Sequence, residues 1–195
     1  DLRLACEVQV RILKKDMLRE RLMLDAIAGR RVWDVESTFE VVVITQNVDE
    51  LHERAGSSNV IHLHGQLAYA RGTSDSPKRY RIEDSAISLG QLCEDGTQLR
   101  PDIVWFGEQT QHMDEARWHV STAAKVLVIG TSLAVHPAAS LLKAARGRAE
   151  KVLVSLEMDR IPYGFTYLRG LATAVAPRLA EKWLAGAREG SDSAS

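Results

Sequence analysis

Long apolar runs, cysteines and an excess of either charge are what this sequence has least of. Its best apolar runs, Val41–Thr45 and Val126–Ile129, have the length of a strand and fall far short of a membrane span. The formal charge is −1, from 25 Lys and Arg against 26 Asp and Glu, and this balance does not favour binding to nucleic acid or to an anionic membrane. We therefore expect neither a nucleic-acid nor a membrane partner.

Cysteine occurs twice in the 195 residues, as Cys6 and Cys93. Two thiols cannot build a disulfide framework or an all-cysteine zinc site. The sequence opens at Asp1 with no initiator Met and no signal-peptide pattern, which predicts a reduced, cytoplasmic protein whose N-terminal portion is missing. With 45% apolar and 26% charged residues, the chain has the ordinary composition of a globular domain.

Strand and helix patterns alternate along the chain and predict an α/β fold, a Rossmann-like doubly wound parallel sheet. Continuous β-branched runs predict strands buried on both faces, and shorter runs predict two more; the five predicted strands are 40–45, 60–64, 79–82, 125–129 and 151–156. Apolar residues at helical spacing predict helices at 4–28, 134–146 and 177–187. Polar clusters follow two of the strand ends, at 46–49 and 130–132, where a doubly wound sheet binds its ligand.

The polar stretch 66–100 interrupts this pattern and predicts a small subdomain inserted between the two parts of the main domain, 1–65 and 101–187. We expect the subdomain to be held together by packing of its apolar residues, which are Tyr80, Ile82, Ile87, Leu89 and Leu92. Residues 188–195 predict a disordered polar tail.

His62 and His64 lie two residues apart on a predicted strand, so their side chains are expected on one face. This spacing permits a metal pair completed by a ligand from 49–53, a single general base with one structural histidine, or two ordinary histidines near the surface. The spacing alone does not decide between them.

Four blocks of the sequence, in order, resemble the sirtuin family of NAD-dependent protein lysine deacylases. The blocks are Thr45–Gly56, Val60–Gly65, Leu99–Glu108 and Val128–Ala139. The phrasing Arg-Pro-x-Ile-Val-Trp-Phe-Gly-Glu in the third block is most similar to a bacterial branch that includes desuccinylases.

The resemblance implies a reaction in which the acyl group of a modified lysine passes to ADP-ribose and nicotinamide leaves NAD. It places the general base at His64, a suitable side chain because imidazole exchanges protons near neutral pH. It leaves His62 a packing or hydrogen-bonding role. The nicotinamide half of NAD would be bound by Gln46, Asn47, Val48 and Asp49.

The resemblance also implies the rest of the site. The NAD-binding turn would be Gly130, Thr131 and Ser132, and the adenosine side would be bound by Ser155, Leu156, Glu157 and Ala172. The substrate peptide would pair with Val104, Trp105, Phe106 and Gly107, with Phe106 as a wall of the acyl-lysine tunnel. Without the family, the same residues could equally form capped turns and an aromatic core strand.

Three departures from the family pattern qualify these expectations. Residues 1–38 contain no Gly-rich turn for the NAD phosphates. The family's four-cysteine module is reduced to Cys93, with Gly72 where the first ligand is expected, so we predict no bound metal and a zinc-free subdomain. The Tyr–Arg pair that binds acidic acyl groups is also missing, since the first Tyr is Tyr69.

The leading hypothesis is an NAD-dependent deacylase, either a deacetylase or a desuccinylase, acting on acylated lysines of proteins or peptides. The alternative is a non-catalytic module that binds NAD or acyl-lysine, suggested by the missing phosphate turn. A metal hydrolase built on His62 and His64 is the third hypothesis.

Overall fold

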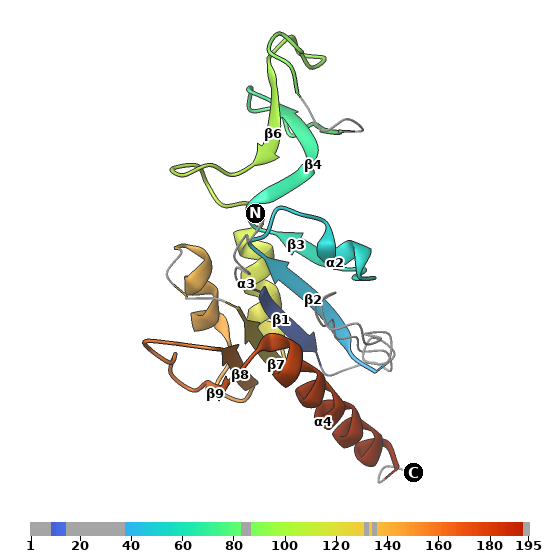
Figure 1. The fold of residues 1–195 in the computed structure, drawn as a ribbon, viewed down its shortest axis with the longest axis vertical. Helices are drawn as coiled ribbons and strands as arrows, with labels where there is room; N and C mark the ends of the chain where they lie inside the picture. The colour runs from blue at the N-terminus through green and yellow to red at the C-terminus, as the bar shows by residue number, and fades with distance from the viewer. Residues whose placement is uncertain (1–8, 15–37, 83–86, 131–132, 134–135, 193–195) are drawn as a thin grey trace.

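The computed structural model describes residues 9–14, 38–82, 87–130, 133 and 136–192, which form two β-sheets (Figure 1). The larger, six-stranded sheet has the order β3-β2-β1-β7-β8-β9, with bounds β1 Gln9–Lys14, β2 Glu40–Thr45, β3 Val60–His62, β7 Lys125–Ile129, β8 Glu150–Ser155 and β9 Thr166–Arg169. The smaller, three-stranded sheet has the order β5-β4-β6, with bounds β4 Gly65–Gly72, β5 Arg79–Arg81 and β6 Leu99–Ile103.

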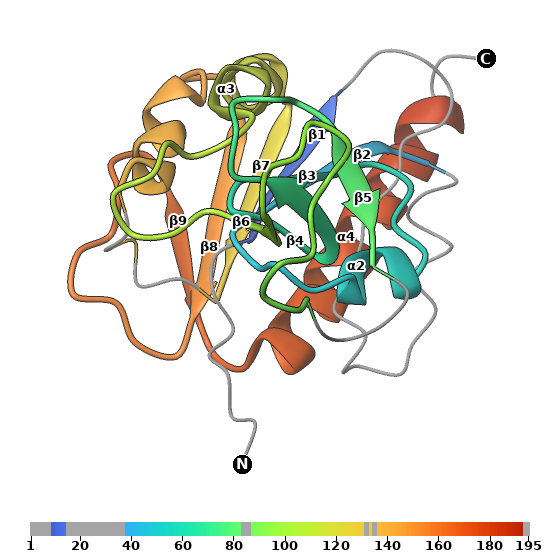
Figure 2. The ribbon, with the colours of Figure 1, turned by 90° about the horizontal axis from the view of Figure 1, so that it is seen from above.

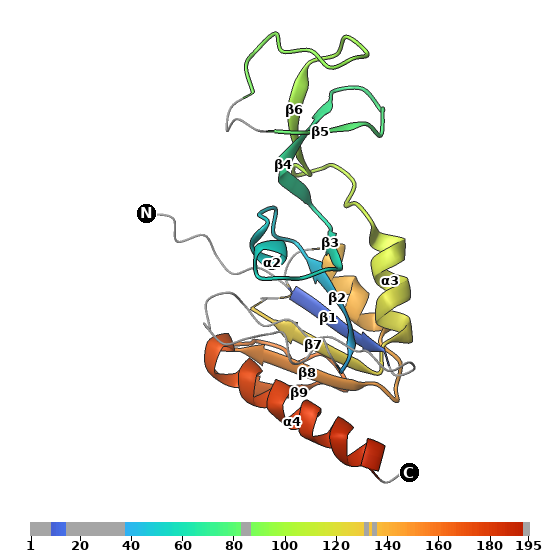
Figure 3. The ribbon, with the colours of Figure 1, turned by 90° about the vertical axis from the view of Figure 1, so that its right-hand side faces the viewer.

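Helices cover both faces of the larger sheet (Figure 3). On one face Val42 and Ile44 of β2 belong to the core cluster that includes α3 (Met113–Thr122) and η2, a 3₁₀ helix at Ala138–Ala144. On the other face Val41 and Val43 pack in the cluster of α4 (Ala172–Asp192). Successive side chains of a strand alternate between faces, so a strand covered on both sides needs a continuous apolar run, as the sequence predicts.

The strand directions qualify the prediction of a parallel sheet. The α/β fold is confirmed, with β2–β3, β7–β8 and β8–β9 parallel, but β1 runs antiparallel to both β2 and β7. The helix predicted over 4–28 is therefore wrong for Gln9–Lys14, because strand pairing on both sides satisfies this backbone and outweighs its helical periodicity. The remaining residues of 4–28 lie outside the described part of the chain.

Two other predicted helices differ in their bounds. Within 134–146 the helical segment is the 3₁₀ helix η2, which starts only after Pro137, since a proline ring keeps the preceding residue out of the α conformation. Helix α4 starts at Ala172, ahead of the predicted start at Pro177, which lies in its second turn and removes one intrahelical hydrogen bond. The helix continues to Asp192, so the disordered tail predicted from residue 188 is wrong up to that point. No helix of the described residues is long and apolar enough to cross a membrane.

Charged side chains, more than apolar packing, hold the small sheet together. Leu89 is 98% exposed and Leu92 57% exposed, so the expected packing around them is wrong. Asp102 on the edge strand β6 is 1% exposed instead and pairs with Arg71 of the adjacent β4 and with Arg79 of β5 beyond it. Strand β4 begins and ends with glycine and mixes polar with small apolar residues, so it has no apolar pattern from which the strand can be predicted.

The polar clusters at strand ends meet at one edge of the larger sheet. Gln46 directly follows β2, Gly130 follows β7, and Ser155 is the last residue of β8; these three strands run in the same direction. The small sheet stands beyond this edge, as the view from above also shows (Figures 1 and 2). A ligand that bridges the sheets would bind here.

We predict that Leu153→Ala lowers the free energy of unfolding by about 2–5 kcal/mol, because Leu153 is fully buried in the cluster under α3 and its loss leaves a cavity. Urea denaturation at neutral pH measures the effect. Leu89→Ala is the matched control and should change stability by less than about 0.5 kcal/mol, since Leu89 faces solvent. Similar losses in the two variants would contradict the described core.

Candidate active site

Gln46 is a buried amide whose hydrogen-bonding groups are unused within the described residues. Its side chain is 4% exposed, and neither Nε2 nor Oε1 has a partner there. An amide taken out of water without partners costs free energy, which a ligand with complementary groups would recover. Gln46 thus fits a ligand that both donates and accepts hydrogen bonds, such as a carboxamide or a ribose hydroxyl.

The rest of the 46–50 loop is tied to three neighbouring elements. Leu67 of β4 donates its N–H to the Val48 carbonyl at 2.7 Å. The Nδ1 atom of His62 lies 2.9 Å from the carbonyl oxygen of Asn47. Arg81 of β5 binds both carboxylate oxygens of Glu50, at 3.1 and 3.3 Å. The small sheet and β3 therefore fix the shape of this loop.

Asp49 also has the local role of a turn residue. Its Oδ1 atom accepts the N–H of Leu51 at 3.0 Å at the start of α2 (Leu51–Arg54), while Asn47 donates its own N–H to Thr45 Oγ1 at 3.0 Å. The interpretation of this segment as a capped turn therefore applies to Asp49, whereas nothing described engages Gln46 in this way.

His64 lies on the short connection between the two sheets, and its backbone is held from both sides. The preceding Leu63 is 1% exposed, donates to the Thr45 carbonyl and accepts from Gln111, both at 2.9 Å. The carbonyl of His64 accepts the N–H of Val104 at 2.9 Å. His64 itself is half-buried.

Gly65 makes this close arrangement of His64 possible. Its φ is +78°, and a Cβ at this position would lie 2.0 Å from the backbone oxygen of Asp102. A side chain would therefore collide with β6 and also strain the turn.

His62 has a different environment from His64. It is 6% exposed, and its Nε2 atom lies 2.7 Å from Glu53 Oε1. Strand β3 ends at His62, so His64 lies in the turn beyond it, and the strand alternation on which the metal-pair hypothesis was based does not extend to His64. The described residues include no group of three side chains suited to a metal ion. The hydrogen-bonding role expected for His62 is confirmed.

The aromatic segment after β6 is an exposed loop instead of a core strand. Trp105 is 53% exposed and Phe106 is fully exposed, and Glu108 donates its N–H to the Trp105 carbonyl at 3.0 Å to close a turn in which Gly107 has a φ of +93°. Val104, which precedes the turn, is half-buried.

Glu108 anchors this loop to the small sheet. Its carboxylate accepts two hydrogen bonds from Arg100, at 2.5 and 2.7 Å, one from Arg71 at 3.3 Å and the N–H of Trp105 at 3.1 Å. The hydrogen bonds from Arg100 lower the pKa of Glu108 to about 2. The sequence contains this residue inside a motif but gives no sign that it pairs with arginines from two strands.

The residues expected on the adenosine side are only partly described. Gly130 has a φ of +66° and donates its N–H to the Val154 carbonyl at 3.3 Å, but Thr131 and Ser132 lie outside the described residues. Ser155 donates its hydroxyl to the Glu157 carbonyl at 2.7 Å, so these two residues form a local turn, with Leu156 exposed. Ala172 is the half-buried first residue of α4.

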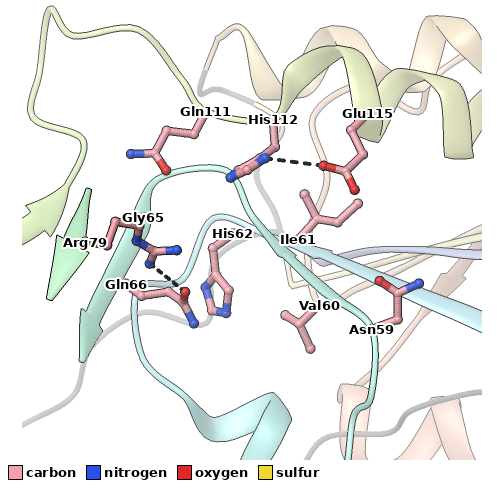
Figure 4. A pocket seen from close by; sticks show the side chains of 10 residues that line it. All are labelled: Asn59, Val60, Ile61, His62, Gly65, Gln66, Arg79, Gln111, His112 and Glu115. Atoms are coloured by element: carbon pink, nitrogen blue, oxygen red, sulfur yellow. Dashed lines mark hydrogen bonds and ion pairs between the residues drawn. The ribbon is translucent and has the colours of Figure 1, made fainter. Parts of the chain in front are cut away.

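A polar pocket of about 230 Å³ adjoins the site without containing any of the residues predicted to bind NAD or the substrate (Figure 4). It lies between β3, β4 and the start of α3 and is lined by Asn59, Val60, Ile61, His62, Gly65, Gln66, Arg79, Gln111, His112 and Glu115. Arg79 donates to Gln66 at 2.8 Å, and His112 pairs with Glu115 at 3.3 Å.

A model of the Sir2 family matches residues 30–137, more than half of the chain, and includes the 46–50 loop, His64 and the Trp105–Phe106 loop. The chain belongs to the Sir2 family. This agrees with the sirtuin resemblance of its four sequence blocks.

Known sirtuins and sirtuin structures support this membership. An NAD-dependent protein deacylase of Helicobacter pylori is 50% identical over 114 residues, which cover 58% of this chain and 49% of that protein. One of Vibrio cholerae is 37% identical over 188 residues, covering 91% of this chain and 76% of that protein. The chain spans about half the length of the first curated relatives that it matches.

Two solved structures show the same fold. A Sir2 homologue in complex with NAD superimposes with a TM-score of 0.59 at 35% identity, covering 75% of this chain and 58% of the other. A Sir2 complex with a p53 peptide and NAD+ gives a TM-score of 0.58 at 32% identity, covering 71% and 61%.

We predict that Glu108→Gln loosens the Trp105–Phe106 loop, because an amide cannot pair with Arg100 and Arg71 as a carboxylate does. The pKa of Glu108 is lower in the folded protein than its ordinary value of 4.5, so its stabilising effect is complete above pH 4.5 and is lost as the pH falls toward 2. Urea midpoints of the wild type and the variant should therefore differ at pH 6 and converge in that acid range.

Glu94→Gln provides the control for this measurement. Glu94 pairs with Lys78 at an exposed part of the small sheet, so its variant should follow the wild type at every pH. A constant difference between Glu108→Gln and the wild type down to pH 2 would contradict the proposed ion-pair anchor.

Proposed function

We propose that this chain carries the catalytic site of an NAD-dependent protein lysine deacylase, with His64 as general base. The observation that carries the proposal is the buried, unused amide of Gln46, at the same sheet edge as the His64 segment. The names of the Helicobacter and Vibrio relatives, which are NAD-dependent protein deacylases, support the same activity. Acylated lysines of proteins or peptides would be the substrates, in the cytoplasm.

Each part of the site has a chemical task in this proposal. NAD, when bound, would supply the ribose carbon to which the acyl group is transferred, with nicotinamide as the leaving group. Gln46 offers one donor and one acceptor to the nicotinamide half, and Asn47 offers a second amide. His64 accepts the proton of a ribose hydroxyl, a transfer suited to an imidazole at neutral pH.

The exposed Trp105–Phe106 loop would bind the other substrate. Phe106 contributes an uncovered ring against which the aliphatic chain of an acyl-lysine could pack. Extended backbone at Val104, directly after β6, could pair with the substrate peptide by strand addition. Glu108 accepts the N–H of Trp105 and so anchors the loop. The loop therefore begins directly after Val104, whose own N–H is bonded to the His64 carbonyl.

We predict that His64→Ala lowers the rate of nicotinamide release coupled to deacylation by about 10²–10⁴-fold, the usual contribution of a general base. Nicotinamide and deacylated peptide are measured together by chromatography, and circular dichroism checks the fold. His112→Ala is the matched control, since His112 is a half-exposed histidine of the neighbouring pocket and should leave turnover unchanged. Unchanged turnover in His64→Ala would refute the assignment.

The alternative is a module that binds NAD or acyl-lysine without catalysis. Calorimetry of this chain with NAD, followed by a turnover assay, separates the two functions. Binding of NAD without nicotinamide release would favour the module, whereas absence of NAD binding would exclude catalysis by this chain.

We also propose that the small sheet contains no zinc. Cys93 donates its thiol to Asp95 Oδ1 at 2.7 Å and lies 3.1 Å from Thr97 Oγ1. The hydrogen bonds that Asp95 accepts from Cys93, Ser74 and Thr97 keep the pKa of its carboxyl well below its usual range. A Cβ on Gly72 would lie 2.8 Å from Cys93 Sγ, so the position expected for the first metal ligand has no room for a side chain. In this proposal, hydrogen bonds hold together the part of the small sheet that a zinc ion would otherwise hold.

We predict that elemental analysis of the purified chain finds far less than one zinc per molecule and that a chelator leaves the unfolding midpoint unchanged. Gly72→Ala should destabilise the small sheet, because its Cβ would displace Cys93 and Thr97. Gly147→Ala, where no atom lies within 4 Å of the added Cβ and the backbone is not left-handed, controls for the loss of a glycine. One bound zinc per molecule would contradict the proposal.

A further inference from the structure

The environment of His62 determines where its protons lie. Its Nδ1 atom faces the carbonyl oxygen of Asn47 at 2.9 Å, and its Nε2 atom faces Glu53 Oε1 at 2.7 Å. A backbone carbonyl and a carboxylate only accept hydrogen bonds, so both ring nitrogens must donate. A neutral ring has only one N–H, so either tautomer would leave a lone pair facing one of these two oxygens, at a distance where the two repel each other.

The other charged groups near His62 are paired with residues other than His62. Arg79 of β5 binds Gln66 and Asp102, and Gln66 in turn donates to Glu53 Oε1 at 3.4 Å. From the other side of the pocket, His112 and Glu115 of the α3 end pair with each other (Figure 4). Glu53 is thus the charged group that the structure pairs with His62.

The three partners belong to three different parts of the site. Glu53 lies on α2, His62 ends β3, and Asn47 lies in the loop that follows β2. Because His62 is 6% exposed, this contact is protected from water, and a charged donor forms a stronger hydrogen bond than a neutral one. The bond therefore fixes the direction of the Asn47 carbonyl and, through the planar peptide unit, the Val48 N–H.

We propose that His62 is a positioning residue, held as an imidazolium by Glu53, that sets the shape of the 46–49 loop for the nicotinamide half of NAD. The proposal rests on the deacylase function for the identity of the ligand. His62 touches no reacting atom in this scheme; it acts through the Asn47 carbonyl, and His64 carries out the proton transfer.

The protonation state is tested without any cofactor. Nitrogen-15 NMR of the histidine rings at pH 7 should find both nitrogens of His62 protonated. In Glu53→Gln the second ring proton should be lost, because a neutral amide does not stabilise the charged ring. A wild-type His62 with one unprotonated nitrogen at pH 7 would overturn the proposal.

The positioning role is tested by three variants in the deacylase assay. His62→Leu removes both donors and should raise the KM for NAD by about tenfold with kcat changed by less than about twofold, the effect of one charged hydrogen bond. His62→Asn keeps a donor for the Asn47 carbonyl and should return the KM to within about threefold of the wild type. His112→Asn makes the same change at the neighbouring pocket histidine and should have no effect. Equal KM values for His62→Leu and the wild type would refute the role.

Failure of the proposed function can be told apart from failure of this inference. If the wild type binds no NAD, the deacylase proposal fails, and the loop is then followed by hydrogen exchange of the Leu67 amide, which is bonded to the Val48 carbonyl. Exchange should be faster in His62→Leu and unchanged in His62→Asn. Equal exchange rates in the wild type and His62→Leu would overturn the positioning role.

Discussion

The contact between Gly65 and the backbone of Asp102 is the constraint on which the candidate site depends. It brings β4 and β6 together at the point where the chain leaves the larger sheet, at a distance that excludes any side chain. His64 is thereby placed next to Val104, and the exposed aromatic loop begins one residue later. The histidine and the loop expected to bind the acyl-lysine owe their proximity to this single close approach.

Electrostatic pairing takes over in the small sheet where apolar packing is missing. Asp102 is the most deeply buried of its described carboxylates, and one arginine from each of the other two strands pairs with it. The buried acid and its partners cost desolvation energy, which good pairing geometry must offset. Such ion pairs fix the register of the small sheet, but the sheet buries little apolar area and so gains little stability from it. The small sheet therefore depends on the larger sheet for its stability.

Residue patterns predict the parts of this protein that are buried on both faces. The bounds of β2 and β7 match the prediction to the residue, since four consecutive apolar residues, most of them β-branched, are typical of a short strand that is covered on both faces. Strand β1 was predicted as a helix because its partners, β2 and β7, are distant in the sequence. Leu89 looked like core because hydrophobicity alone does not tell whether a small domain has enough apolar neighbours to cover it.

Candidate site residues that lie in a sequence motif could be named from the sequence. Contacts between side chains that are distant in the sequence could not. Gln46 and His64 stood out by their place in the family blocks, whereas the contact of Glu53 with His62 joins residues nine positions apart on different elements. No periodicity relates them. Similarly, Glu108 belongs to a sequence motif, but its partners Arg71 and Arg100 lie on two other strands and are not indicated by that motif.

The hydrogen bond from Leu67 to Val48 has a mechanical consequence. Strand β4 holds one end of the small sheet against the 46–50 loop, while β6 leads at the other side into the aromatic loop. The three-stranded sheet thus connects the two loops mechanically, and a change in its register would displace both of them.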